Sequence, residues 1–288
     1  MNDLIRQYAN LPPEKQELFK KLLSKQGVDP TSLILPLGRA STTFPLSYAQ
    51  QRLWFLDQLE PGSPLYHVAT AVRLKGTLDK SILERCIQGL VQRHETLRTV
   101  FSMTAEDPVQ KILPELDLPI NWVDLSECPA EEQEEICIHL LKEEAQIPFD
   151  LSKGPLIRIT LYRLNNSEHI ALLVMHHIIT DGWSMTVFIR ELANLYAAYS
   201  LEMASNLPPQ WIQYPDYAVW QRNWLEGTRL EEQIDYWKLA LANLPDPLEL
   251  PVDHQRPAIQ TFRGSTHSFI IPSEQYNRFL TLDRKSVV

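Results

Sequence analysis

The chain has 288 residues and a formal net charge of -9, and its 44% hydrophobic content is typical of a folded protein. The acidic balance argues against nucleic-acid binding, because phosphate affinity rests on clustered Lys and Arg. The longest apolar run, Ile170–Met175, is far shorter than the roughly 20 residues of a membrane-spanning helix. No membrane association is expected. The N-terminus lacks the pattern of a secretory signal, so a cytoplasmic location is predicted.

The three cysteines, Cys86, Cys128 and Cys137, are scattered and form no Cys-x-x-Cys pair. Neither a disulfide framework nor a zinc site is therefore indicated. No phosphate-cradling glycine loop is present either, so the sequence predicts no bound metal or nucleotide.

The first 40 residues read as a helical segment and a linker. Apolar residues over 3–27 recur at helical spacing and are interrupted by Leu11-Pro12-Pro13-Glu14, which predicts two short helices. Gly27 is placed to end the second helix, and residues 29–40 form an extended linker.

Residues 41–205 mix helical and strand periodicities. Helices are predicted over Leu46–Leu59, Leu78–Arg93 (capped by Thr77 or Asp79), Glu131–Gln146 and around Phe188–Tyr199; strands are predicted over His67–Lys75, Leu97–Met103, Val109–Leu113, Ile120–Val123, Leu156–Leu164 and His169–His176. The last strand is apolar at consecutive positions, as expected of a central strand covered on both faces. The order favours an α/β layered sandwich and leaves the order of strands open.

Residues 206–288 are predicted to begin a second part of the protein. Helices near Tyr217–Leu225 and Arg229–Asn243 lead to a proline-rich stretch, Pro245–Pro257, and then to a strand over Thr266–Ile271 and a helix over Pro272–Leu282.

The segment with the clearest chemical content is Met175-His176-His177-Ile178-Ile179-Thr180-Asp181-Gly182, where a central strand stops and a helix starts. Adjacent strand residues point to opposite faces, so one of the two histidines should be structural. His177, nearer the loop, is the better candidate to share a proton with a nucleophile. Asp181 is placed to orient a ring or neutralise a cation. Gly182 permits a tight turn or a close backbone approach, and its amide is placed to hold an oxyanion.

Other interpretations of the histidines stay open on the pattern alone. Two neighbouring histidines are also compatible with satisfied core residues. A metal site is less favoured, because side chains on opposite faces do not converge on an ion. Serine hydrolysis is disfavoured, since the chain has no Gly-x-Ser-x-Gly elbow.

The His-His-x-x-x-Asp-Gly pattern at 176–182 resembles the signature of nonribosomal peptide synthetase condensation domains, which share the chloramphenicol acetyltransferase fold. Four further stretches look like motifs of this family: Leu46-Ser47-Tyr48-Ala49-Gln50-Gln51-Arg52-Leu53-Trp54-Phe55-Leu56, Arg93-His94-Glu95-Thr96-Leu97-Arg98-Thr99-Val100-Phe101, Tyr214-Pro215-Asp216-Tyr217-Ala218-Val219-Trp220 and Leu250-Pro251-Val252-Asp253-His254-Gln255-Arg256-Pro257. The resemblance covers nearly all of the chain after the linker.

The resemblance implies two lobes with a tunnel between them, reached by the phosphopantetheine arms of donor and acceptor carrier proteins. Other synthetase modules are implied as further partners, with no cofactor bound directly. The acceptor amine would attack the donor thioester at a catalytic motif that comprises His176, His177, Asp181 and Gly182, with His177 positioning or deprotonating the amine. Asp181 would form a structural ion pair with Arg98, which by pattern alone reads as a surface charge at a strand edge. The opening motif at 46–56 is similar to the subtype that joins two L-configured residues.

Family members continue well past the end of this chain, so the N-terminal lobe (41–205) is expected to be complete and the C-terminal lobe only begun. A truncated chain with reduced activity and a tendency to associate is expected. Two alternatives remain: epimerisation or another carrier-dependent acyl transfer on the same fold, and a non-catalytic fragment that docks carrier proteins.

Overall fold

A computed structural model describes residues 2–245, 251–254, 264–265 and 267–283. Contacts divide the chain into two units, Met1–Asn243 and Leu244–Val288, and each is described by itself. The boundaries predicted at 40 and 205 remain predictions. Among the described residues, no helix is long and apolar enough to cross a bilayer.

The first unit begins with the two predicted helices, α1 (Asn2–Ala9) and α2 (Pro13–Lys25). Pro12, with φ -57° and ψ 148°, is extended and separates them, and a proline at the first position of α2 needs no hydrogen-bond partner for its nitrogen. Gly27 has φ 79°, a left-handed conformation that ends a helix. The segment then runs through the short 3-10 helix η1 (Pro30–Ser32) into extended chain.

The main sheet has four strands in the order β2-β7-β6-β5. The strands are β2 (His67–Lys75), β5 (Ile120–Asp124), β6 (Ile157–Asn165) and β7 (Glu168–His176). β7 pairs antiparallel with both β2 and β6, whereas β5 runs parallel to β6. A parallel pair needs a crossover, and α5 (Ala130–Gln146) supplies it. The predicted central position of the strand at 169–176 is confirmed.

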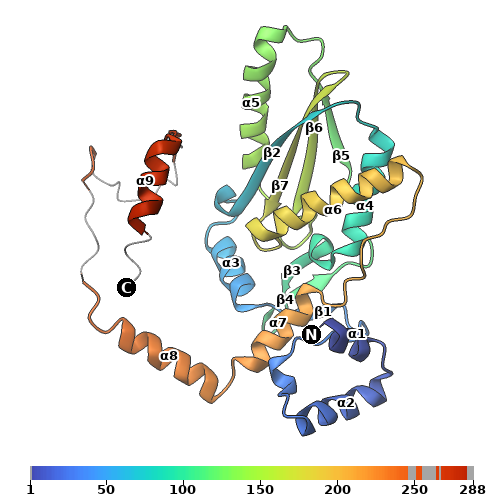
Figure 1. The fold of residues 1–288 in the computed structure, drawn as a ribbon, viewed down its shortest axis with the longest axis vertical. Helices are drawn as coiled ribbons and strands as arrows, with labels where there is room; N and C mark the ends of the chain where they lie inside the picture. The colour runs from blue at the N-terminus through green and yellow to red at the C-terminus, as the bar shows by residue number, and fades with distance from the viewer. Residues whose placement is uncertain (1, 246–250, 255–263, 266, 284–288) are drawn as a thin grey trace. The chain divides into compact units, whose positions relative to one another are not determined.

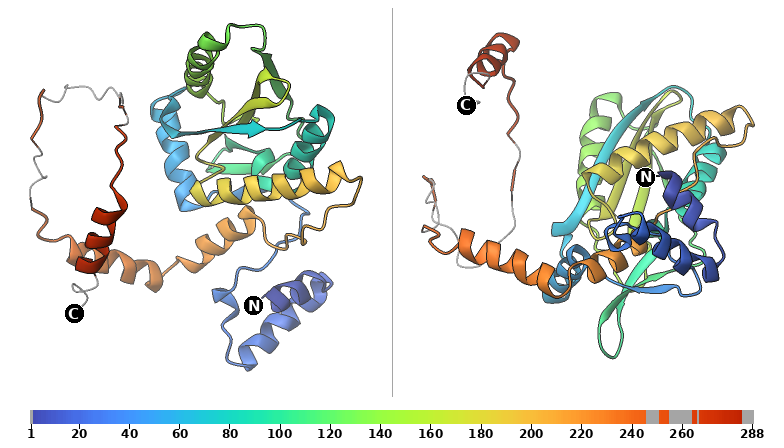
Figure 2. Two further views of the ribbon diagram at one scale, coloured as in Figure 1. Left: turned by 45° about the horizontal axis from the view of Figure 1, so that its top comes forward. Right: turned by 60° about the horizontal axis from the view of Figure 1, so that its bottom comes forward.

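Helices cover both faces of this sheet. α4 (Lys80–Arg93) packs against α6 (Gly182–Ser200), and α6 crosses the sheet (Figure 1). α5 lies on the opposite face (Figure 2), where Glu134 pairs with Arg73 of β2. Cys86, Leu90 and Val91 of α4 are fully buried in the core, which removes from water the apolar stripe that predicted this helix.

A second, smaller sheet was not foreseen as a separate unit. It has the order β1-β4-β3, with β1 (Thr43–Pro45), β4 (Pro108–Ile112) and β3 (Thr99–Met103). β1 escaped prediction because three residues that include a proline carry no alternation signal. Along the chain, α3 (Tyr48–Leu59) and the 3-10 helix η2 (Pro64–Tyr66) connect β1 to β2, and the 3-10 helix η3 (Glu95–Arg98) leads into β3. A capping box from Ser47 and Gln50 fixes the start of α3.

Two helices close the first unit, α7 (Tyr214–Trp224) and α8 (Thr228–Ala240), and both were predicted. α7 packs on β1 and η1, so it belongs to the same body as the sheet. In the second unit, α9 (Ser273–Asp283) matches the predicted last helix. The predicted strand at 266–271 is wrong for its described residues, 267–271, which pair with no other strand. Part of the proline-rich stretch 245–257 lies outside the described residues.

Candidate active site

The two neighbouring histidines lie on opposite sides of the main sheet. His176 is the last residue of β7, pairs with His67 of β2, and is 2% exposed. His177 is exposed, and its backbone N–H donates to Tyr66 O at 2.7 Å. Strand alternation therefore extends one residue past the end of β7 and sends the two rings in different directions.

His176 is enclosed by aromatic rings on the α5 face. The ring centroids of His67 and Phe149 lie 6.1 and 6.4 Å from its own. Its Nδ1 accepts a hydrogen bond from the Ile178 N–H at 3.1 Å. Burial, followed by the charges of His67 and His177, lowers the pKa of His176 to about 4. A buried neutral ring that accepts a backbone N–H suits a structural role better than a catalytic one, and the assignment of that role to His176 stays a prediction.

The ring of His177 has one recorded hydrogen-bond partner among the described residues. Its Nδ1 lies 2.5 Å from the carbonyl oxygen of Thr180. A carbonyl only accepts, so Nδ1 carries the proton and donates it. In the neutral ring Nε2 is then the unprotonated nitrogen, the form that a proton acceptor requires.

His177 lines a pocket of about 410 Å³. Segments from α3, the end of α4 with η3, the end of β7, the start of α6 and the approach to α7 form its walls: Ala49, Arg52, Leu53, His94, Thr96, Leu97, Met175, His177, Ile178, Ile179, Thr180, Asp181, Trp183, Ser184, Val187, Phe188, Gln210, Ile212, Gln213 and Tyr214. His176 is not among them. The pocket thus gathers residues from four of the family-like motifs, those at 46–56, 93–101, 176–182 and 214–220.

Asp181 and Gly182 form the start of α6 at the rim of this pocket. Asp181 Oδ1 accepts from the Ser184 Oγ at 2.6 Å and from the Ser184 N–H at 2.7 Å. These two hydrogen bonds, the hydroxyl first, lower the pKa of Asp181. Gly182 has no positive φ, and a Cβ there would meet nothing within 4 Å. The predicted tight turn at Gly182 is therefore not required, and its backbone borders open space.

The expected ion pair between Arg98 and Asp181 is not formed among the described residues. Asp181 is occupied with capping α6. Arg98 instead donates from Nη1 to Leu113 O at 2.5 Å, and its Nη2 lies 4.0 Å from Glu95 Oε1. Asp181 caps an exposed helix start, whereas Arg98 lies in a polar network in which its Nε and Glu95 Oε2 are buried without a recorded hydrogen-bond partner.

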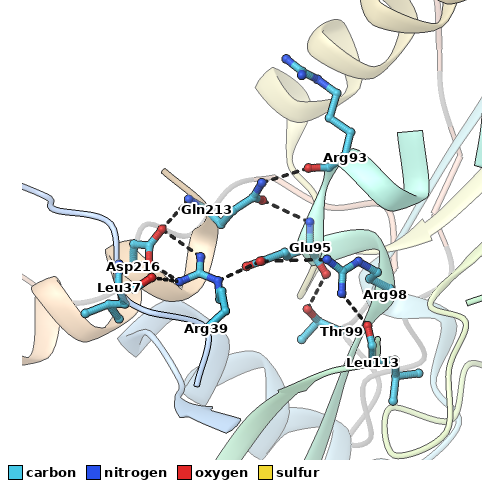
Figure 3. A network of polar contacts seen from close by, with 9 residues as sticks. All are labelled: Leu37, Arg39, Arg93, Glu95, Arg98, Thr99, Leu113, Gln213 and Asp216. Atoms are coloured by element: carbon cyan, nitrogen blue, oxygen red, sulfur yellow. Dashed lines mark hydrogen bonds and ion pairs between the residues drawn. The ribbon is translucent and has the colours of Figure 1, made fainter. Parts of the chain in front are cut away.

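That network, shown in Figure 3, centres on Arg39 from the predicted linker. Arg39 Nη1 and Nη2 donate to the two carboxylate oxygens of Asp216 at 2.8 and 3.1 Å. Its Nε donates to Glu95 Oε1 at 2.8 Å. The bidentate pairing suits a buried carboxylate, because the side chain of Asp216 is 0% exposed. Sequence reasoning missed Arg39, since a lone arginine in an extended stretch carries no pattern.

Gln213 joins this network to the pocket wall. Its side-chain amide donates to Arg93 O at 2.9 Å, and its amide oxygen accepts from the Glu95 N–H at 3.1 Å. Its own N–H donates to Asp216 Oδ2 at 2.7 Å. The segment 210–214, which lines the pocket, is thereby fixed to the end of α4 (Figure 3).

Comparisons with known proteins agree with this architecture. The Condensation domain family matches residues 40–286. A linear gramicidin synthase of Brevibacillus parabrevis is 47% identical over 252 residues, which are 88% of this chain and 5% of that protein. Phosphinothricin tripeptide synthetase PhsC of Streptomyces viridochromogenes is 38% identical over 277 residues, which are 95% of this chain and 25% of that protein.

Solved structures show the same fold. The X-domain in its complex with OxyB from teicoplanin biosynthesis superposes with a TM-score of 0.69 at 31% identity, covering 79% of this chain and 50% of that chain. The first condensation domain of the calcium-dependent antibiotic synthetase, in complex with substrate analogue 2a, gives 0.65 at 25% identity over 72% of this chain and 49% of that one.

The fold is thus the predicted α/β, chloramphenicol acetyltransferase-like one. The chain belongs to the condensation domain family, as the resemblance predicted. It spans about half the length of these solved chains and a small part of the synthetases that it matches.

The burial of His176 predicts a pH-dependent stability. The folded-state pKa of His176, about 4, lies below the ordinary value of 6.5, so its contribution is fully present above about pH 6.5 and is lost as pH falls toward 4. Between about pH 7 and pH 5 this histidine alone should lower the free energy of unfolding by about 2 kcal/mol.

Urea denaturation at both pH values measures this difference. His176→Gln, which keeps an acceptor for Ile178 N–H, should show a smaller drop than the unmodified chain. His139→Gln on exposed α5 is the matched control. An equal drop in the His176 variant and the unmodified chain would contradict the assignment.

The Arg39–Asp216 pair predicts a second stability effect. Asp216→Asn removes one of the two carboxylates that pair with Arg39, and a cost of about 1–3 kcal/mol is expected, below the range for fully buried pairs because Arg39 is 33% exposed and keeps Glu95. Asp235→Asn, which breaks the exposed pair with Lys238, should cost less than about 0.5 kcal/mol.

Hydrogen exchange locates this effect. Amides of residues 210–224 should exchange faster in Asp216→Asn than in Asp235→Asn. Unchanged exchange there would show that the network does not hold the pocket wall.

Proposed function

We propose that this chain carries the histidine-bearing part of an amide-forming site, in which the amine of an acceptor aminoacyl thioester attacks a donor acyl thioester. Both substrates are carried on phosphopantetheine arms of carrier proteins. The observation that carries the proposal is His177, which lines the pocket with its Nδ1 bound to Thr180 O and with no partner of Nε2 recorded among the described residues.

The proposed role of His177 follows from its tautomer. Nε2 accepts a hydrogen bond from the attacking amine, which orients the nitrogen lone pair toward the thioester carbonyl carbon. As the C–N bond forms, the carbonyl oxygen gains negative charge, and the imidazole takes the proton that the nitrogen loses. The C–S bond then breaks, and the thiolate receives that proton.

The start of α6 is the proposed site of oxyanion stabilisation. The first N–H groups of a helix lack intrahelical partners and lie at the positive end of its dipole. Asp181 uses the Ser184 N–H, while no hydrogen bond from the Gly182 N–H to a described residue is recorded. Open space beside Gly182 leaves room for the substrate oxygen to approach that amide.

A binding role is the second candidate. The likeness to a teicoplanin X-domain that was solved as a complex with OxyB favours a scaffold that recruits a protein partner. In that case a loaded carrier protein would bind without product, and His177→Ala would leave its affinity unchanged.

Single-turnover amide formation separates the two. One carrier protein is loaded with a labelled aminoacyl group and a second with a different amino acid, and transfer of label is followed. We expect His177→Ala to lower the rate by about 100-fold or more, since positioned proton transfer contributes 10²–10⁴. His139→Ala, an exposed imidazole on α5, should not change it.

Calorimetric titration with the loaded carriers completes the test. The catalytic proposal would be contradicted if the carriers bind but the unmodified chain and the His177 variant form equal amounts of product, or none. That result would support the binding role.

A further inference from the structure

A second imidazole lines the same pocket and is held in a comparable way. His94 caps the C-terminal end of α4 and contributes to the pocket wall. Its Nε2 lies 2.7 Å from Glu191 Oε2, on α6. Glu191 is 5% exposed and also accepts from Arg93 Nε at 2.9 Å.

The charge on Glu191 determines which nitrogen of His94 is open. Burial by itself raises the pKa of Glu191, but hydrogen bonds from Arg93 and His94 outweigh it and lower that pKa. An ionised carboxylate only accepts, so His94 Nε2 carries the proton. Among the described residues, none is recorded as a hydrogen-bond partner of His94 Nδ1, and that atom is not among the buried unpaired ones.

His94 and His177 are therefore anchored through different ring nitrogens. His177 is anchored through Nδ1 to a carbonyl, and His94 through Nε2 to a carboxylate. A carboxylate on one nitrogen fixes the tautomer and stabilises the charge that the ring gains when the other takes a proton. The other charged or titratable groups around the pocket are Arg52, Asp181 and Tyr214 on its wall and Arg93 behind His94.

The proposed reaction has two protons to remove from the acceptor nitrogen. An α-amino group ordinarily titrates near pH 7.7–8.0, so about nine in ten acceptor amines are ammonium ions at pH 7. An ammonium nitrogen has no lone pair and cannot attack. One proton must leave before attack and a second when the amide forms, whereas the departing thiolate takes back only one.

We propose that His94, positioned by Glu191, accepts the ammonium proton of the acceptor substrate before attack. The inference rests on the proposed function. The proton passes from the ammonium nitrogen to His94 Nδ1 and then to water. The freed amine attacks the thioester carbon, His177 takes the second proton, and the thiolate receives it as the C–S bond breaks. Thioester and ammonium thus give amide, thiol and one released proton.

Nitrogen NMR tests the first step without turnover. The chain is labelled with ¹⁵N-histidine, and His94 is assigned from the spectrum of His94→Gln. The probe is glycyl-pantetheine with an unreactive amide in place of the thioester. At about pH 7 we expect its binding to move Nδ1 of His94 to the protonated position. N-acetylglycyl-pantetheine, which has no ammonium group, should not, and Glu191→Gln should weaken the response.

The pH dependence of single-turnover amide formation tests the consequence. His94→Gln should lower the rate about tenfold near pH 6.5 and less than about twofold near pH 9, where the amine is already neutral. His177→Ala should lose rate at both. A residue that only joins α4 to α6 would, when replaced, lower the rate equally at both values.

The outcomes separate this inference from the proposed function. Amide formation with an unshifted His94, or with an equal loss at both pH values in His94→Gln, overturns the inference and leaves the function standing. Protonation of His94 by the glycyl probe without any amide supports the role of His94 and overturns the function. An unshifted His94 without amide overturns both.

Discussion

The structure depends on a single constraint, the alternation of side chains where β7 ends. The pairing of His176 with His67 and the hydrogen bond from His177 N–H to Tyr66 O hold this end in register with β2. A slip by one residue would exchange the faces of the two histidines. His177 would then occupy the buried position, and its ring would be lost from the pocket. The same backbone geometry therefore buries the His176 ring and directs the His177 ring to the pocket.

Around this strand end, the pocket is built from chain segments that are far apart in sequence and are joined by buried polar contacts. Arg39 and Asp216 connect the linker to α7, and Gln213 connects α7 to the end of α4. A buried ion pair is costly to desolvate and contributes little net stability, but removing one partner is strongly unfavourable. Such contacts therefore favour one arrangement of segments over others, which is what a site assembled from five segments requires.

Local sequence was sufficient for most of the fold. The strand at His67–Lys75 agrees with its prediction at both ends, and the helix ending at Arg93 begins within two residues of its predicted start. Both have a strong apolar periodicity, and the helix has an ordinary N-cap residue. The three-residue β1 and the order of the strands within each sheet depend on pairing with distant residues, and no local pattern encodes them. The strand expected near Ile271 has a suitable composition but no described partner.

The site was predictable in part for the same reason. The strand–loop–helix pattern predicted His177 and Asp181 as site residues, and both line the pocket, while alternation predicted different faces for the two histidines, of which His176 is the buried one. The ion pair of Asp181 with Arg98 was transferred by resemblance and is replaced here by local capping. His94, Glu191 and Arg39 were missed as site residues, because their significance arises from contacts across 50 or more positions: Arg39 to Glu95 spans 56, and His94 to Glu191 spans 97.

The tautomer of His177 is the most direct test of this account. Nitrogen NMR of the ¹⁵N-histidine-labelled chain, assigned with His177→Gln and recorded near pH 8, above the ordinary titration range of imidazole, reports which ring nitrogen carries the proton. We predict a protonated Nδ1 and an unprotonated Nε2, as the contact with Thr180 O requires. A protonated Nε2 with an unprotonated Nδ1 would contradict it, since the pocket would then face a donor where amide formation needs an acceptor.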